Sequence, residues 1–154
     1  MNGIRRLRLA TPAALVLATL TAVLPAAAQQ SPAPVRLDAD KMAGLDLTSI
    51  PPDAYQDILV AGALNMRVAT LFDGTELAVS IFESTPAKTD HRTRPTDVDE
   101  FVYVLSGKLI LTEPDGTRHE YTPGDALVLP IGYTGTWEMQ GNYRELVVLM
   151  KKPD

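Results

Sequence analysis

The chain has 154 residues, a formal net charge of −5 and no cysteine. Without cysteine, disulfides, thiolate metal sites and cysteine nucleophiles are excluded, so an exported form must rely on its core alone. The acidic charge argues against nucleic acid or an anionic lipid surface as a partner, because both need a basic face.

The first 28 residues are predicted to be a secretory signal peptide. Three arginines begin this segment, an apolar run from Leu9 to Leu24 follows, and the small residues Ala26 to Ala28 precede the expected cleavage. The run is shorter than the roughly 20 residues of a membrane-spanning helix. Cleavage predicts a periplasmic or secreted protein that does not associate with the membrane; the sequence leaves Sec and twin-arginine export open.

Residues 29–65 are predicted to form a leader and an arm. Residues 29–35 are polar and proline-bearing and favour a flexible leader. Residues 38–45 fit a short helix, and residues 53–60 fit another turn or two of helix. We assign no functional residue to this arm.

Residues 66–154 are predicted to form one small all-β domain. Its short apolar segments alternate with turn signals and are not separated by long helical patterns, which favours an antiparallel barrel or jelly roll. The expected strands are 66–72, 76–83, 100–105, 108–113, 118–121, 126–129, 134–139 and 143–151, with turns at Ser106-Gly107 and Gly141-Asn142 among others. The long connection 84–99 leads to Glu100 and is expected to border a binding site.

Two spaced segments carry a family resemblance. Glu100 is followed after six residues by Gly107, and in GDALVLPIGYTGTW Gly124 is followed by Pro130 and then Gly132. These segments resemble the two halves of the cupin double motif. Together with FESTPA and DEFVYVLSGKLILTEPDGT, they are similar to the cupin subgroup that includes ureidoglycine aminohydrolase-like and ethanolamine-utilisation proteins.

The resemblance implies a jelly-roll barrel with a site in its interior. By strand alternation Glu100, Val102 and Val104 would point inward, while Phe101 and Tyr103 would point to the other face with Leu105. That second face is strongly apolar and must be covered, and a homodimer, as is common in the family, would cover it.

The sequence departs from metal-binding members of this family. They place a His-x-His pair shortly before the glutamate, where this chain has Arg94, Pro95 and Thr96, and a further histidine where this chain has Gly135. Of the four usual ligands only Glu100 is kept, and a lone carboxylate does not hold a transition metal. We therefore predict no metal and no cofactor, although a weak site formed by His91, Glu100 and waters stays open.

The candidate site residues are Glu100, Trp137, Tyr133, His91 and Val102. Gly135 shares a strand face with Trp137, and its missing side chain is expected to open volume beside Glu100. Trp137 would offer a flat apolar wall with one N–H donor, and Tyr133 would lie near the rim. Alternatively, Trp137 fills the core and Glu100 accepts hydrogen bonds from the backbone of the barrel.

Three functions fit the sequence. The first is an exported cupin that binds a small polar metabolite inside the barrel, with Glu100 pairing a cationic or hydroxyl group. The second is an aminohydrolase-like or isomerase-like enzyme in which Glu100 is the catalytic general acid or base. The third is an interaction module whose surface carries the function. Because a fold does not determine chemistry, the sequence leaves these alternatives open.

Overall fold

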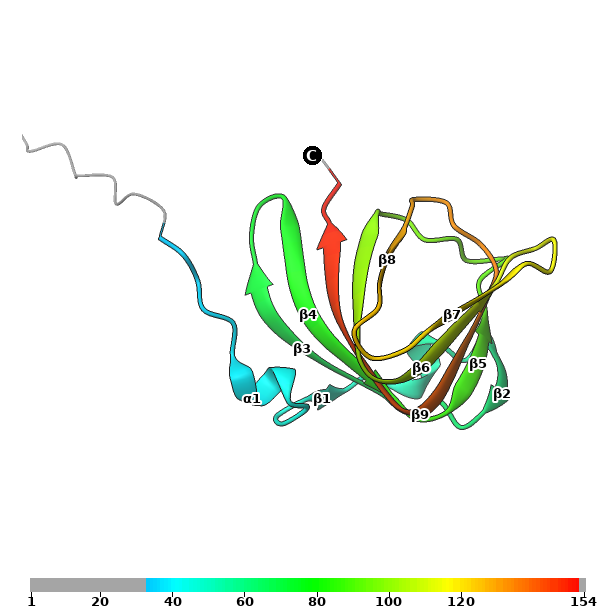
Figure 1. Cartoon of the computed structure of the whole chain (residues 1–154), viewed down its shortest axis with the longest axis horizontal. Coiled ribbons are helices and arrows are strands. Elements are labelled where there is room, and N and C mark those ends of the chain that lie inside the picture. Colours follow the sequence, from blue (N-terminus) through cyan, green and yellow to red (C-terminus); the bar gives the residue numbers. More distant parts are fainter. Residues whose placement is uncertain (1–32, 153–154) are drawn as a thin grey trace, which may run out of the picture. The chain divides into compact units, whose positions relative to one another are not determined.

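The computed structural model describes residues 33–152, so the predicted signal peptide lies outside the described residues. Nearly all elements are strands (Figure 1). They are α1 (Ala39–Met42), β1 (Thr48–Ser49), the 3₁₀ helix η1 (Pro52–Ala54), β2 (Leu59–Gly62), β3 (Met66–Asp73), β4 (Leu77–Ser84), β5 (Ala87–Asp90), β6 (Glu100–Thr112), β7 (Arg118–Tyr121), β8 (Ala126–Leu129) and β9 (Thr136–Met150). Within residues 33–152, no helix has the length and apolar character needed to cross a membrane.

All strands belong to one antiparallel sheet that curls into a half-barrel (Figure 1). Strands β1, β3, β4, β9, β5 and β2 follow one another in hydrogen-bonded order, and β6 joins β9 to β7 and β8. This arrangement confirms the predicted all-β antiparallel class and is consistent with a cupin jelly roll.

The predicted turns at Ser106-Gly107 and Gly141-Asn142 are wrong, because each lies within a continuous strand. Strands β6 and β9 pair along most of their lengths, with register shifts between Val104 and Lys108. Gly107 and Gly141 have φ angles of 71° and 69°, a left-handed conformation that favours glycine. Gly107 and Gly141 therefore mark bends within the paired strands β6 and β9, and both strands continue past them.

The core lies on the inner face of this curved sheet. Val102 and Val104 are fully buried, whereas Phe101 and Tyr103 are 38% and 39% exposed. The predicted alternation of β6 is therefore confirmed. Its inner face packs against a cluster that includes Leu109, Leu111, Leu127, Leu129, Met139, Tyr143 and Val147.

The arm contributes to the sheet and to the core. Asp38 caps α1 by accepting hydrogen bonds from the amides of Asp40 and Lys41, so the predicted helix exists but is shorter than expected. β1 pairs with β3, and β2 pairs with β5, which itself lies in the predicted irregular connection. Tyr55 and Ile58 are buried in the core, so the arm completes the fold.

Candidate functional site

Glu100 begins β6 and lines two adjoining cavities on the inner face of the sheet. The cavities measure about 500 and 450 Å³, the size range of small-molecule sites. Both are lined by Ile58, Met66, His91, Arg94, Glu100 and Trp137. The structure thus brings together three of the predicted site residues, Glu100, His91 and Trp137.

The Glu100 carboxylate is held in an unfavourable environment for a charge. Burial, followed by the nearby charge of Asp97, raises the pKa of Glu100 to about 7. Glu100 forms none of the side-chain hydrogen bonds or ion pairs found among residues 33–152. The alternative that it is satisfied by the backbone of the barrel therefore has no support in these contacts.

A second carboxylate, Glu145 on β9, lines the smaller cavity together with Glu100. Glu145 is 5% exposed and accepts a hydrogen bond from the hydroxyl of Tyr143. Burial raises the pKa of Glu145 to about 7; the Tyr143 hydrogen bond opposes this shift and the charge of Glu100 adds to it. Two carboxylates from different strands are thus electrostatically coupled within one cavity.

Sequence reasoning missed Glu145, although it carries a detectable signal. It occupies an inward position of β9 between the buried residues Tyr143 and Val147. A glutamate with two buried neighbours on the same face of a strand must find a partner, because an unpaired buried charge is costly. The same alternation argument applied to β9 would have identified it.

His91 and Trp137 form the wall beside Glu100. Their ring centroids lie 5.0 Å apart at an interplanar angle of 31°. His91 Nε2 lies 3.0 Å from Thr89 Oγ1, and the backbone amide of His91 donates to the Gly135 carbonyl. Burial, the largest effect, lowers the pKa of His91 and favours the neutral imidazole at pH 7.

The arm closes one side of the larger cavity, which its residues Ile50, Ala54, Tyr55 and Ile58 help to line. Arg94 Nη1 donates to the Ala54 carbonyl at 2.9 Å and lies 3.5 Å from Asp57 Oδ1. The backbone amide of Asp90 also donates to the Ile58 carbonyl. The arm, to which the sequence assigned no functional residue, therefore lines the cavity, because contacts distant in sequence bring it there.

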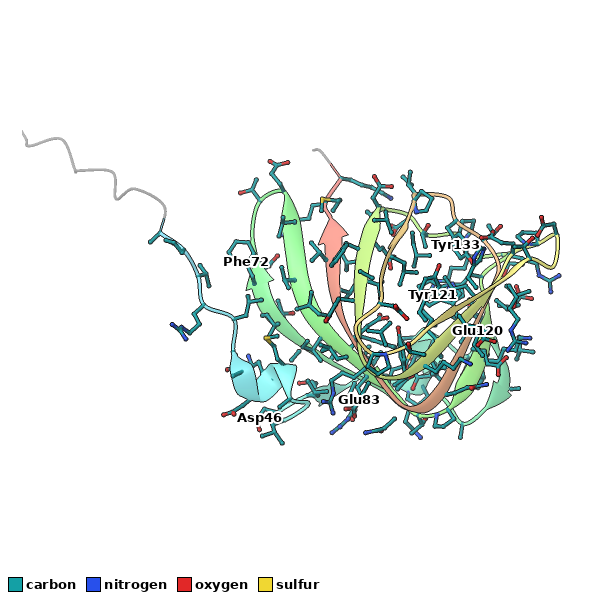
Figure 2. The ribbon with its side chains drawn as sticks, in the orientation of Figure 1. Asp46, Phe72, Glu83, Glu120, Tyr121 and Tyr133 are labelled. Carbon is teal, nitrogen blue, oxygen red and sulfur yellow. The ribbon has the colours of Figure 1, made fainter. Side chains whose placement is uncertain are left out.

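Val102 and Tyr133 lie outside the residues that line the two cavities. Val102 is buried in the core cluster. Figure 2 shows Tyr133 near Tyr121, and the pKa of Tyr133 is raised to about 12 by burial and by the charges of Glu113 and Tyr121. The hydroxyl of Tyr133 is buried without a hydrogen-bond partner among the described residues.

Gly135 does not open volume beside Glu100, contrary to expectation. A Cβ atom added at Gly135 would lie 2.5 Å from the Thr112 carbonyl oxygen and 3.1 Å from the Tyr133 hydroxyl. The φ angle of Gly135 is 147°, which L side chains rarely adopt. The space that a histidine would need here is already filled by the neighbouring strand and by Tyr133.

The donors of the described residues do not fit the metal of metal-binding cupins. Within residues 33–152, no three His, Cys, Asp or Glu side chains are grouped so that they could hold an ion. The backbone at Gly135 has no room for the family's further histidine.

His119 does not line either cavity. It lies on β7, and its Nε2 is 3.5 Å from Glu113 Oε1.

Comparisons with known proteins agree with this fold. Residues 73–145 match the family model described as EutQ-like cupin domain. A Pseudomonas syringae pv. tomato protein of unknown function has a TM-score of 0.59 and 23% identity over 67% of this chain, which spans only 43% of that protein. No curated protein matches the chain.

Two further solved structures are similar. The EutQ protein of Clostridium difficile has a TM-score of 0.54 and 16% identity over 71% of this chain and 83% of its own. KdgF from a Halomonas species has a TM-score of 0.52 and 16% identity over 73% of this chain and 91% of its own. At these identities the structures establish the fold. Residues 73–145 thus resemble a EutQ-like cupin domain in sequence and the solved cupin structures in fold; the ureidoglycine aminohydrolase-like subgroup stays a prediction.

Proposed function

We propose that this protein, with a EutQ-like cupin domain over residues 73–145, binds a small polar organic molecule in the cavities that Glu100 lines. The observation that carries the proposal is the unpaired Glu100 carboxylate beside Trp137. Glu100 is half-buried, so its carboxylate loses part of its hydration without gaining a protein partner, and a bound donor group would compensate for that cost.

The surroundings of Glu100 support a binding site over a solid core. The cavities combine apolar walls with a few polar groups, which is the usual composition of small-molecule sites. Trp137 is the only tryptophan of the chain and lines both cavities, so its ring is available as a flat surface for the apolar part of a ligand.

A thermal-shift screen of small polar metabolites on the purified protein tests this proposal. Compounds that bind the cavity should raise the melting temperature of the wild type, because binding to the native state alone stabilises it. Glu100→Ala and Trp137→Ala should abolish the shift. Glu138→Ala, on the same strand as Trp137 but not among the residues lining these cavities, should retain it. Shifts that survive both cavity substitutions would contradict the assigned site.

Acid–base catalysis by Glu100 is a second candidate, favoured by its pKa of about 7. A group with such a pKa exchanges protons readily at neutral pH. Compounds that shift the melting temperature would be incubated with the protein and followed by NMR. Turnover that Glu100→Gln abolishes would support an enzyme, and unchanged turnover in that variant would remove the assignment.

We also propose export, on the basis of residues 1–28 alone. Expression of the full chain in a Gram-negative host should yield a periplasmic form that begins at Gln29, measured by fractionation and mass spectrometry. A cytoplasmic form that retains the first residues would contradict the proposal.

A further inference from the structure

The smaller cavity has an excess of hydrogen-bond acceptors and of negative charge. Glu100 and Glu145 reach it from β6 and β9, and their charges interact. Of these two glutamates, Glu145 is only 5% exposed, and its carboxylate accepts a hydrogen bond from the hydroxyl of Tyr143. One donor leaves the other oxygen of this carboxylate available to a ligand.

The cations near the cavity do not balance these charges. Arg94 is the only lysine or arginine among the described residues that line either cavity. Its side chain is 56% exposed and is bound to the Ala54 carbonyl and to Asp57. Asp97 also lines the larger cavity, but it is paired with Lys152, whose Nζ lies 3.1 Å from Asp97 Oδ2; burial keeps His91 neutral. The field inside the smaller cavity therefore favours a positive group.

The remaining wall of the smaller cavity is largely apolar. It is formed by Ile58, Leu64, Met66, Val68, Phe82, Trp137, Met139, Val147 and Leu149. Ser80 and Thr89, which are 8% and 3% exposed, add two hydroxyl groups. A fully hydrated inorganic cation would leave this apolar surface uncovered, whereas an organic cation would bury it.

We propose that the occupant is a small organic ammonium compound, with its nitrogen between Glu100 and Glu145 and its hydrocarbon part against Trp137. This inference rests on the proposed function, since it names the ligand class of the same site. Two charged acceptors satisfy several N–H groups of one ammonium, and the indole face attracts the same charge. Glu145 becomes a ligand-binding residue in addition to Glu100.

Three probes of one shape and different charge test the ligand class. They are 3,3-dimethylbutylammonium, 3,3-dimethylbutanol and 3,3-dimethylbutanoate, which share a tert-butyl group and differ at the other end. Binding to the full-length protein would be followed at pH 8 through the indole N–H signal of Trp137 in ¹H–¹⁵N NMR spectra. Because the chain has a single tryptophan, this signal reports on the cavity wall without ambiguity.

The ammonium probe should bind about tenfold or more tightly than the alcohol, and the carboxylate should bind most weakly, since hydrogen bonds to charged groups add roughly that factor. Glu145→Gln and Glu100→Gln should each remove most of the preference for the ammonium while leaving alcohol binding unchanged. Glu138→Gln changes the net charge equally on β9 but is not among the residues lining either cavity, so it should behave as the wild type.

The outcomes separate this inference from the proposed function. Equal or tighter binding of the alcohol or carboxylate would overturn the cationic class and leave a small-molecule site intact. An ammonium preference that persists in both glutamine variants would overturn the assigned contacts. Should Glu145→Gln fail to fold, Glu100→Gln with the same probes decides the question. No response to any probe would overturn the inference, whereas the proposed function fails only with the thermal-shift screen.

Discussion

Two buried glutamates of this protein show how the partners of a side chain determine its role. Glu83, near the end of β4 at the lower side of the view in Figure 2, is 5% exposed and is paired with both Arg67 and Arg144. Burial alone would raise the pKa of Glu83, but the hydrogen bonds from these arginines hold it below its ordinary value. Glu145 is equally buried, but within residues 33–152 its side chain is bound only by Tyr143. Glu83 is therefore structural, whereas Glu145 faces a cavity with its charge uncompensated.

The raised pKa of Glu145 predicts a stability that falls as the pH rises. The native state holds this proton up to about pH 7, whereas the unfolded chain releases it near pH 4.5. The contribution of this pKa difference to the free energy of unfolding is thus fully present below pH 4.5 and is lost as the pH rises to about 7. Glu145→Gln should be more stable than the wild type at pH 8 by on the order of 2 kcal/mol, and equally stable near pH 4.5. Urea unfolding at both pH values would measure this.

A Glu145→Gln variant that loses the same stability at both pH values would contradict the assigned pKa. Glu138→Gln is the control, because this solvent-side residue of β9 pairs only with Gln140 among the described side chains. Its effect should be small at either pH, since exposed substitutions usually change stability by less than about 0.5 kcal/mol.

At the scale of elements, two long bent strands place the candidate site. Strands β6 and β9 pair on both sides of the bends at Gly107 and Gly141. One half of β9 pairs with β4 and the other half pairs with β5. Because of these bends, one pair of strands supplies three residues to the lining of the same cavity: Glu100 from β6, and Trp137 and Glu145 from β9.

Gly107→Ala should destabilise the protein more than Gly116→Ala. Both glycines have positive φ angles, so an alanine costs about 1 to 2 kcal/mol at either position. At Gly107 the new Cβ would also lie 2.7 Å from the Gln140 carbonyl oxygen and from the Tyr143 Cα, whereas nothing lies within 4 Å at Gly116. We expect an additional cost of about 1 to 3 kcal/mol at Gly107. Denaturant midpoints of the two variants would test this, and equal midpoints would argue against a tight bend.

At the scale of the whole described unit, the half-barrel has two contrasting faces. The inner face holds the core and the cavities, and the arm adds β1 and β2 to the edges of the sheet. On the outer face Phe101 and Val128 are cross-strand partners that are 38% and 63% exposed, and Tyr103 lies two residues along the strand. Apolar side chains gathered on one sheet face are typical of an interface.

The homodimer expected from the sequence stays a prediction, with this outer face as its interface. Analytical ultracentrifugation should give the mass of a dimer, and Val128→Lys should weaken dimerisation about tenfold or more by burying an unpaired charge. Val60→Lys is a matched control, since Val60 is 58% exposed and lies on β2. A monomeric wild type, or equal effects of both variants, would contradict this interface.

The β class, the strands β7 and β8 and the inward position of Glu100 could be predicted from the sequence, because alternation and turn residues act between near neighbours. The resemblance of two short segments also predicted the cupin fold that the family model and the solved structures support. The continuity of β6 and β9 was missed, since a glycine with a positive φ angle occurs both in turns and in bends of paired strands.

The sequence by itself determined the class of fold, the absence of thiol chemistry and an inward-facing carboxylate at the start of β6. Tertiary structure alone decided which side chains share the cavity. In the structure Arg94 lines both cavities with Glu100, and Glu145 lines the smaller one. Residues of the arm line the larger cavity, and Tyr133 lies outside the lining of both. The physical reason is that burial and charge coupling depend on distances through space between strands, and local patterns along the chain do not contain those distances.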